Sequence, residues 1–395
     1  MKLRLASEKA FLAVFFFLPI SKPLMFIAFC VASILFIASG NMTKVRQSWH
    51  TLPWMIPGLI LSVLPLLSLL IHSEPKQNFQ YFNLSYFWLI ALVIFLASSQ
   101  ISITPWIRAF LCGTFIALCY SKLNQYGWVE LPSAPLALGN LILFSQFLAL
   151  GILLFSILYR HERKRHMKAL YLSGIAIFFW GLTENGSRSG MLSVLIFLPF
   201  IFYSIFGRKN RGKMFAGCLV VILLMALSPK VQQRVNAAVS DLQQFENKIT
   251  NTSIGYRFEM WRTAWEIFRA HPILGAGPSA FTKEWNKTPQ TKEAMVFVEP
   301  HNAFAFFASS YGLIGLFTLI WLYTALLWTG WTHRQTFEGS IIFVFAVIFV
   351  VGSFTNTMFT GAVSRALIML FIGLQGSLLA TSNSVLQRQK AVTAS

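Results

Sequence analysis

The first candidate for chemistry is a short polar segment, residues 183–190, that separates two apolar runs. Arg188 and the hydroxyl groups of Ser187 and Ser189 can all donate hydrogen bonds to an anion. Glycines on either side of them let the backbone approach a ligand closely. The segment therefore predicts a phosphate-binding loop. The alternative is an ordinary turn in which Arg188 pairs with Glu184 or with a lipid headgroup.

A second arginine, Arg257, occupies an unusual position on a predicted amphipathic helix at residues 256–270. The apolar stripe of this helix includes Trp261, and Arg257 falls on the same stripe one turn earlier. No acidic residue lies three or four positions away from Arg257. An inward-facing arginine without a local partner needs a carboxylate, a carbonyl or an anionic ligand. We expect Arg257 to bind a ligand or, alternatively, to form a structural ion pair.

The third candidate is His301, which follows Pro300 at the start of a long apolar run. Proline suits the first position of a helix, so His301 is expected where that helix meets the membrane surface. A histidine with a pKa of about 6.5 can accept a proton at neutral pH. His301 is therefore a candidate general base, and the alternative is a hydrogen-bonded helix cap.

The motifs that most often hold a catalytic metal are missing from this sequence. Asp241 is the one aspartate, which excludes a DxD site for a metal-bound nucleotide sugar and any cluster of paired aspartates. The four cysteines all lie inside apolar runs and form no CxxC pair, so a thiolate zinc site is not supported. We therefore expect chemistry without a metal ion or another cofactor.

Apolar runs along nearly the whole chain must position these residues. Of the 395 residues 56% are hydrophobic and 11% are charged, whereas soluble proteins carry roughly 25% charged residues. A membrane-spanning helix needs roughly 20 apolar residues, and fewer where it is buried among others. The sequence predicts an all-α polytopic membrane protein with about twelve transmembrane helices, at residues 10–21, 23–39, 52–71, 85–99, 101–120, 137–159, 169–183, 191–206, 214–228, 301–329, 340–356 and 364–381.

The distribution of lysine and arginine predicts the orientation of these helices. With the N-terminus inside, most basic residues outside the longest loop fall in predicted cytoplasmic segments, and the short outer loops hold few. Both termini are therefore expected in the cytoplasm. The basic runs 160–168 and 208–213 contribute much of the net charge of +19. We expect them beside anionic lipid headgroups and expect no nucleic acid partner.

One long polar segment, residues 229–300, is expected on the outer side and divides the chain into three parts. Residues 1–228 form transmembrane helices 1–9, and residues 301–395 form helices 10–12 and a short cytoplasmic tail. The outer segment is far longer than a connection requires, which is typical of functional loops. It predicts amphipathic helices at 230–248 and 256–270, a glycine-rich turn at 273–279 and an irregular polar stretch at 281–299.

The histidine and the residues after it resemble a known signature. His301-Asn302, nine residues, Gly312, two residues and Gly315 follow the pattern His-(Asn/Ser/Gln)-x9-Gly-x-x-(Gly/Thr/Tyr). This pattern is similar to that of the bacterial O-antigen ligases and the related O-oligosaccharyltransferases.

Both arginine segments resemble the same family. Ser187-Arg188-Ser189-Gly190 resembles its short periplasmic arginine loop, and Arg257-x-x-x-Trp261 resembles the arginine-containing helix of its large periplasmic loop. The number of predicted spans, the inside termini and the single long outer loop extend the resemblance over nearly the full chain.

The resemblance implies a membrane glycosyltransferase of the GT-C type, with its active site at the periplasmic face of a Gram-negative inner membrane. Such an enzyme transfers the O-polysaccharide from undecaprenyl pyrophosphate to a sugar hydroxyl of lipid A–core oligosaccharide, with inversion and without a metal. His301 would be the general base, and Arg188 and Arg257 would bind the pyrophosphate. Supporting roles would fall to Ser187, Ser189, Asn302 and Trp261.

Three alternative functions stay open. An O-antigen polymerase would use the same donor with a second lipid-linked glycan as acceptor. A protein O-oligosaccharyltransferase would glycosylate a serine or threonine of a protein. A lipid-linked-glycan transporter would need ionisable residues deep in several spans, where this chain has Arg108 and little else. We interpret Arg108 and Arg365 as structural or headgroup contacts.

Overall fold

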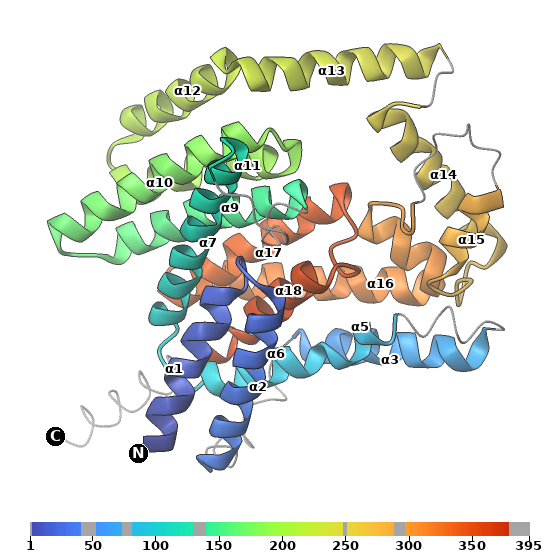
Figure 1. Ribbon diagram of the computed structural model, residues 1–395, viewed down its shortest axis with the longest axis horizontal. Helices are drawn as coiled ribbons and strands as arrows, with labels where there is room; N and C mark the ends of the chain where they lie inside the picture. The colour runs from blue at the N-terminus through green and yellow to red at the C-terminus, as the bar shows by residue number, and fades with distance from the viewer. Residues whose placement is uncertain are drawn as a thin grey trace.

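The computed structural model describes residues 2–40, 53–72, 81–128, 140–247, 251–287 and 297–378, and its regular elements are all α-helices (Figure 1). In chain order the helices are α1 (Lys2–Phe17), α2 (Lys22–Ala38), α3 (Met55–Ile71), α5 (Asn83–Tyr86), α6 (Trp88–Ser98), α7 (Thr104–Gln125), α9 (Leu141–His161), α10 (Arg165–Asn185), α11 (Arg188–Phe206), α12 (Arg211–Leu227), α13 (Pro229–Glu246), α14 (Ser253–Ala270), α15 (Ala280–Lys287), α16 (Ala303–Thr332), α17 (Phe337–Thr355) and α18 (Ala362–Gly373). In Figure 1, α12 and α13 follow the top edge, and α14 and α15 lie at the right.

Each predicted span overlaps a helix of the structure. Among the described residues five helices are long and apolar enough to cross a membrane, namely α7, α9, α11, α16 and α17, and the number is six if α12 and α13 form one bent span. Shorter apolar helices cover residues 22–38, 55–71, 83–98 and 362–378. The expectation of an all-helical, polytopic membrane protein is confirmed, while the number of twelve crossings stays a prediction.

The helix α9 forms the centre of the bundle. Its sequence is apolar on every side, which suits a helix buried among others, and α10, α11 and α17 all pack against it. α9 and α11 approach closely at Gly190, where a β-carbon would lie 2.5 Å from the backbone oxygen of Ser145. The N-terminus of α11, which carries Arg188, is thereby fixed against the centre of the bundle.

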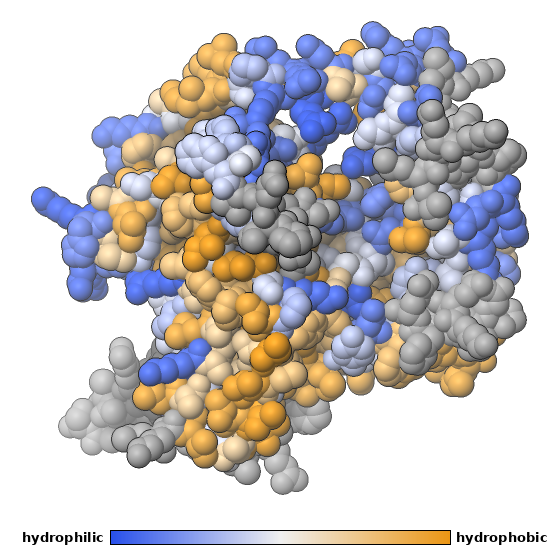
Figure 2. All heavy atoms as spheres, in the orientation of Figure 1, coloured by the Kyte–Doolittle hydropathy of each residue, from blue (hydrophilic) through white to orange (hydrophobic). Residues whose placement is uncertain are grey.

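Polar and apolar surfaces are separated along the molecule. Figure 2 shows hydrophilic residues at the left end and over the upper right, with hydrophobic residues between them. Comparison with Figure 1 places the first group at the junction of α9 and α10 and the second over α13 to α15. Large apolar side chains such as Ile34, Leu70 and Phe215 are exposed. A membrane protein turns such side chains toward lipid.

The segment 229–300 contains both helices that the sequence predicts. α13 and α14 lie within a few residues of the expected bounds. α13 follows α12 after a bend of 71° and has no buried residue, whereas α14 packs against α16. α14 is therefore anchored to the bundle, while α13 extends across its surface.

The irregular stretch predicted at 281–299 is wrong over its first part, because α15 occupies residues 280–287. Phe281 and Trp285 lie one helical turn apart and are both buried in a hydrophobic cluster with the apolar stripe of α14. An aromatic pair at i and i+4 in an otherwise polar stretch was the signal for this helix. The expectation for residues 288–296 lies outside the described residues.

The glycine-rich turn after α14 docks into a break in α16. The N–H group of Leu313 donates to the Pro272 carbonyl at 2.7 Å, and that of Ala276 donates to the Ser309 carbonyl at 3.0 Å. The break lies at Gly312, whose φ of 62° and ψ of −154° belong to a region open essentially to glycine alone. The first glycine of the His301 motif therefore allows the turn to join the helix.

We predict that Gly312→Ala destabilises the fold by about 1–3 kcal/mol, because a β-carbon is strained at this φ and would lie 2.3 Å from the backbone of residue 273. Gly212→Ala is the matched control, since it lies in helical backbone with nothing within 4 Å of the added carbon. Thermal unfolding in detergent should show a lower midpoint for the first variant alone. Equal midpoints for both variants would contradict this account of the break.

Candidate active site

A pocket of about 310 Å³ brings the two predicted arginines together. Its walls come from the α10–α11 junction, from α13 and α14, and from the ends of α9 and α17. The residues that line it are Leu141, Ile142, Asn185, Gly186, Ser187, Arg188, Ser189, Arg234, Ala237, Asp241, Ser253, Arg257 and Thr355. Segments that are far apart in the sequence therefore form one polar site.

Arg188 begins a helix, whereas the sequence predicted a turn there. Gly186, in left-handed conformation with φ of 68°, ends α10, and α11 starts at Arg188 itself. Ser189 and Gly190 thus belong to the first turn of α11, where free N–H groups and the helix dipole favour an anion. The predicted turn over residues 183–190 is therefore too long, because α10 continues to Asn185 and α11 begins at Arg188, which leaves two residues between them.

Arg188 does not pair with Glu184, so this part of the alternative is wrong, while a lipid headgroup as its partner stays a prediction. The Glu184 carboxylate lies 2.6 Å from the Lys230 amine and 3.4 Å from the Lys122 amine. The guanidinium group of Arg188 donates to the backbone oxygen of Arg234 at 3.4 Å. Glu184 is thus occupied by lysines, and Arg188 keeps its charge available in the pocket.

Ser187 and Ser189 connect α11 to α9. The hydroxyl oxygens of Ser145 and Ser187 lie 3.0 Å apart, and the Gln146 amide donates to the Ser189 hydroxyl at 3.0 Å. Ser189 is buried. These contacts hold the N-terminus of α11 in place, and a direct role of either hydroxyl toward a ligand stays a prediction.

Arg257 lies half-buried on α14 and faces the pocket. Within the described part of the chain its side chain forms no ion pair and no hydrogen bond. Burial lowers the pKa of Arg257, and the nearby charge of Arg188 lowers it further. The structural ion pair that was the alternative for Arg257 is therefore absent from the described residues, and two guanidinium groups repel each other here.

Arg234 on α13 is a third arginine of the pocket that the sequence did not single out. With Ala237 and Asp241 it forms a series at i, i+3 and i+7, which is one face of a helix. That spacing was the available signal, but the sequence analysis identified α13 by its apolar stripe and gave no weight to the polar residues beside it. Three arginines and one aspartate among the lining residues leave a formal charge of +2, which suits an anion with two negative charges.

His301 lies just before α16 rather than inside it. The helix begins at Ala303, and Asn302 is its cap, accepting a hydrogen bond from the Ala305 N–H at 3.0 Å. The expectation that Pro300 starts the helix was wrong, because the cap side chain takes over the start two residues later. His301 itself has a φ of 47°, a rare conformation for a residue other than glycine.

Two neighbours of His301 serve to position it. Trp261 donates its indole N–H to the Pro300 carbonyl at 3.1 Å and so links α14 to the histidine segment. The Asn302 backbone N–H donates to the Thr357 hydroxyl at 3.2 Å. The histidine is therefore held between α14 on one side and the loop after α17 on the other.

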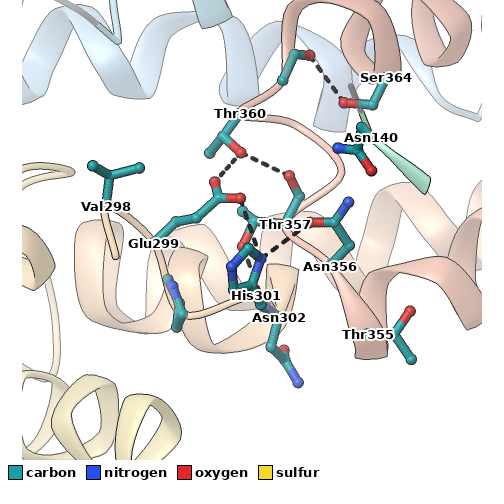
Figure 3. A network of polar contacts seen from close by, with 12 residues as sticks. Asn140, Val298, Glu299, His301, Asn302, Thr355, Asn356, Thr357, Thr360 and Ser364 are labelled. Carbon is teal, nitrogen blue, oxygen red and sulfur yellow. Dashed lines mark hydrogen bonds and ion pairs between the residues drawn. The ribbon is translucent and has the colours of Figure 1, made fainter. Parts of the chain in front are cut away.

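The imidazole of His301 lies between two oxygen acceptors (Figure 3). Its Nδ1 is 3.5 Å from the Asn356 amide oxygen and 3.7 Å from a Glu299 carboxylate oxygen. Two acceptors at Nδ1 favour the tautomer with the proton on Nδ1, which leaves the lone pair on Nε2. Burial lowers the pKa of His301, the contact with Asn356 raises it, and the charge of Arg257 lowers it. The net shift is downward, so the ring is a neutral base at pH 7.

Glu299 is a functional candidate that the sequence reasoning missed. The Thr360 hydroxyl donates to its carboxylate (Figure 3). Burial raises the pKa of Glu299 to about 7, although Thr360 and the charge of Arg365 act in the opposite direction. The signal in the sequence was a carboxylate two residues before the histidine, but only the fold shows that both face the same loop.

Arg365 has a structural role, which is one of the two that the sequence suggested for it, and Arg108 makes one structural contact. Arg365 is buried, donates to the Phe359 carbonyl at 2.7 Å and to the Thr360 carbonyl, and lies over the Phe87 ring at 4.6 Å. It thereby fixes the loop that contacts His301 and Glu299. Arg108 donates to the Tyr171 hydroxyl at 3.0 Å, and neither residue lines the arginine pocket.

The histidine and the arginine pocket are neighbours. Thr355 lines the pocket, and the next residue, Asn356, contacts the imidazole. Arg257 also lies close enough to His301 to shift its pKa. No group of three His, Cys, Asp or Glu side chains able to hold a metal ion occurs among the residues that the structure describes. The arrangement places a histidine beside a cationic pocket that contains Arg188, Arg234 and Arg257.

Comparison with known proteins places these residues in a family context. The family model described as O-antigen ligase matches residues 172–320, a range that contains Arg188, Arg257 and His301. This match confirms the resemblance that the motifs indicated.

Three relatives are similar to parts of this chain. The O-antigen ligase of Escherichia coli K12 is 23% identical over 48% of the chain and 46% of the relative. The O-antigen ligase of Salmonella typhimurium LT2 is 26% identical over 42% of the chain and 41% of the relative. An uncharacterized protein of Haemophilus influenzae Rd is 26% identical over 40% of the chain and 42% of the relative. The matches thus span less than half the length of these relatives, and they indicate a bacterial membrane protein.

We predict that Glu299→Gln removes a pH dependence of stability. The raised pKa means that Glu299 stabilises the fold below its ordinary value of 4.5, and that this contribution is lost as the pH rises through about 7. The glutamine variant does not titrate at this position. The unfolding midpoint of the variant should therefore rise relative to that of the unmodified protein between pH 5 and pH 7.5. Parallel profiles would contradict the buried, protonated carboxyl group.

Proposed function

We propose that this chain, a member of the O-antigen ligase family, transfers an O-polysaccharide from undecaprenyl pyrophosphate to a sugar hydroxyl of lipid A–core oligosaccharide. The observation that carries the proposal is the juxtaposition of unpaired arginines with a neutral histidine base. We further propose that the reaction is metal-independent and inverting, and that the site faces the periplasm from the inner membrane with both termini cytoplasmic.

The arginine pocket suits the leaving group of this reaction. Guanidinium groups form charge-assisted, often bidentate hydrogen bonds with phosphate oxygens. A diphosphate would relieve the repulsion between Arg188 and Arg257, which have no carboxylate partner in the described residues. Negative charge grows on the pyrophosphate as the glycosidic bond breaks, so fixed cations stabilise the transition state more than the bound donor.

The histidine supplies the proton acceptor. Nε2 of His301 takes the proton from the acceptor hydroxyl as its oxygen bonds to the anomeric carbon. The bond from this carbon to the pyrophosphate breaks on the opposite face, and the leaving group keeps the electron pair. The imidazolium that forms then faces the Asn356 oxygen and the Glu299 carboxylate, 3.5 Å and 3.7 Å from Nδ1. Glu299 is thus a positioning residue whose negative form stabilises the protonated ring.

The same geometry could serve an O-antigen polymerase, because donor and base are shared and the acceptor differs. Complementation separates the two functions. A strain that lacks its ligase but makes the matching O-antigen and core should regain capped lipopolysaccharide on a gel when it produces this chain. Longer glycans on the carrier lipid without capping would instead identify a polymerase, and glycosylated protein an oligosaccharyltransferase. Carrier translocation in vesicles without any transfer would identify a transporter.

His301→Ala tests the general base. Loss of a positioned base typically costs about 10²- to 10⁴-fold in rate, and we expect a fall in that range for transfer by membrane vesicles. His166→Ala is the control, because His166 is exposed near the start of α10 and far from the site in the fold. A well-expressed His301→Ala protein with an unchanged rate would overturn the assignment.

Arg257→Ala tests the proposed binding of the diphosphate in the arginine pocket. Losing a charge-assisted contact to the leaving group should slow transfer by about 10- to 100-fold. Arg262→Ala is the matched control on the same helix, since its exposed side chain pairs with Glu266 at 3.1 Å and Glu259 at 3.9 Å. Initial rates at saturating acceptor should fall for Arg257→Ala alone. Similar decreases in rate for both substitutions would mean that the arginines of α14 act only through the overall positive charge of the helix, and would contradict a specific contact of Arg257 with the diphosphate.

A further inference from the structure

A second recess of the molecule lies nearer the start of α10, whereas the arginine pocket lies at the end of this helix. This second recess is a groove of about 490 Å³ between α7 and α10, with α9 contributing to its floor. The groove is lined by Arg108, Leu111, Cys112, Phe115, Ile116, Phe155, Met167, Leu170, Tyr171, Ser173, Gly174, Ile177 and Phe178. Arg108 is its one charged residue, and nearly all other lining groups are apolar.

The charged end of the groove is basic. Arg108 has a side chain that is 48% exposed, and its contact with Glu162 is long, at 3.9 Å. Glu162 is already engaged by the backbone N–H groups of Arg163 and Lys164, at 2.9 Å and 3.1 Å. Residues 160–168 otherwise contribute only basic or neutral side chains. The electrostatic field at this end therefore favours an anion.

The apolar part of the groove has the length of a lipid tail within one leaflet. From Arg108 to Ile116, α7 advances by about 12 Å, and from Met167 to Phe178, α10 advances by about 16 Å, at 1.5 Å per residue. Half of a bilayer's hydrocarbon core is about 15 Å. Several lining side chains, including Phe115, Ile116 and Leu170, are exposed along this path.

We propose that this groove binds one anionic glycerophospholipid, with an acyl chain between α7 and α10 and the phosphate at Arg108. The ligand is distinct from the proposed glycan donor, because Tyr171 at the charged end and Asn185 in the arginine pocket are separated by about 21 Å along α10. The proposal therefore does not depend on the reaction. Such a lipid would join α7 to α10, which share few direct contacts in the described structure.

Native mass spectrometry of the purified full chain tests this proposal. Dioleoyl phosphatidylglycerol is the anionic probe, and dioleoyl phosphatidylethanolamine, at the same concentration in the same detergent, is the matched zwitterionic probe. We expect one tightly retained phosphatidylglycerol per chain and a preference of about fivefold over phosphatidylethanolamine, as one basic residue provides.

Two variants locate the binding. Arg108→Gln should abolish the preference between the lipids, and Ser173→Trp, which places an indole in the groove, should reduce retention of both. Arg211→Gln is the control for charge and Ile34→Trp the control for bulk, because both residues are exposed and neither lines the groove. Each variant is checked for its unfolding midpoint. Equal retention of the two lipids by the unmodified chain, or unchanged retention by folded Arg108→Gln and Ser173→Trp proteins, would overturn the proposal.

Discussion

The arginine pocket depends on a repulsion that the protein itself does not relieve. Arg257 is half-buried and close to Arg188, and no carboxylate pairs with either guanidinium group in the described part of the chain. Like charges held together in partly buried surroundings cost free energy. The surrounding helices must maintain this arrangement, which they do through the close contact of α11 with α9 and through the packing of α14 against α16.

The histidine is positioned by the same framework. The break in α16 at Gly312 admits the turn that follows α14. The helix that carries Arg257 is thus joined to α16 by this turn, and Trp261 joins it to the segment just before α16 that carries His301. Arg365 holds the loop after α17, which presents Asn356 and Thr360 to the imidazole and to Glu299. The arginine pocket and His301 are therefore held at a fixed position relative to each other, as the proposed direct displacement at one carbon requires.

The sequence predicted much of this because local patterns carried the information. Arg257 stood out by its place on an apolar stripe, His301 by its setting at the start of a span, and the helices by their apolar runs. Arg234 and Glu299 were missed, since their importance arises from contacts between segments that are distant in the sequence. α15 was missed because its stability comes from burial against α14 and its own sequence is largely polar.

The most direct test of the central claim is the anomeric configuration of the product. Purified protein in lipid bilayers would receive the lipid-linked donor and the core acceptor in excess chelator, and nuclear magnetic resonance would report the configuration of the new glycosidic bond. The proposed mechanism, with His301 as the base on one side of the sugar and the arginines binding the diphosphate on the other, predicts transfer without added metal and with inversion. Retention of configuration, or transfer that requires a divalent ion, would contradict the account.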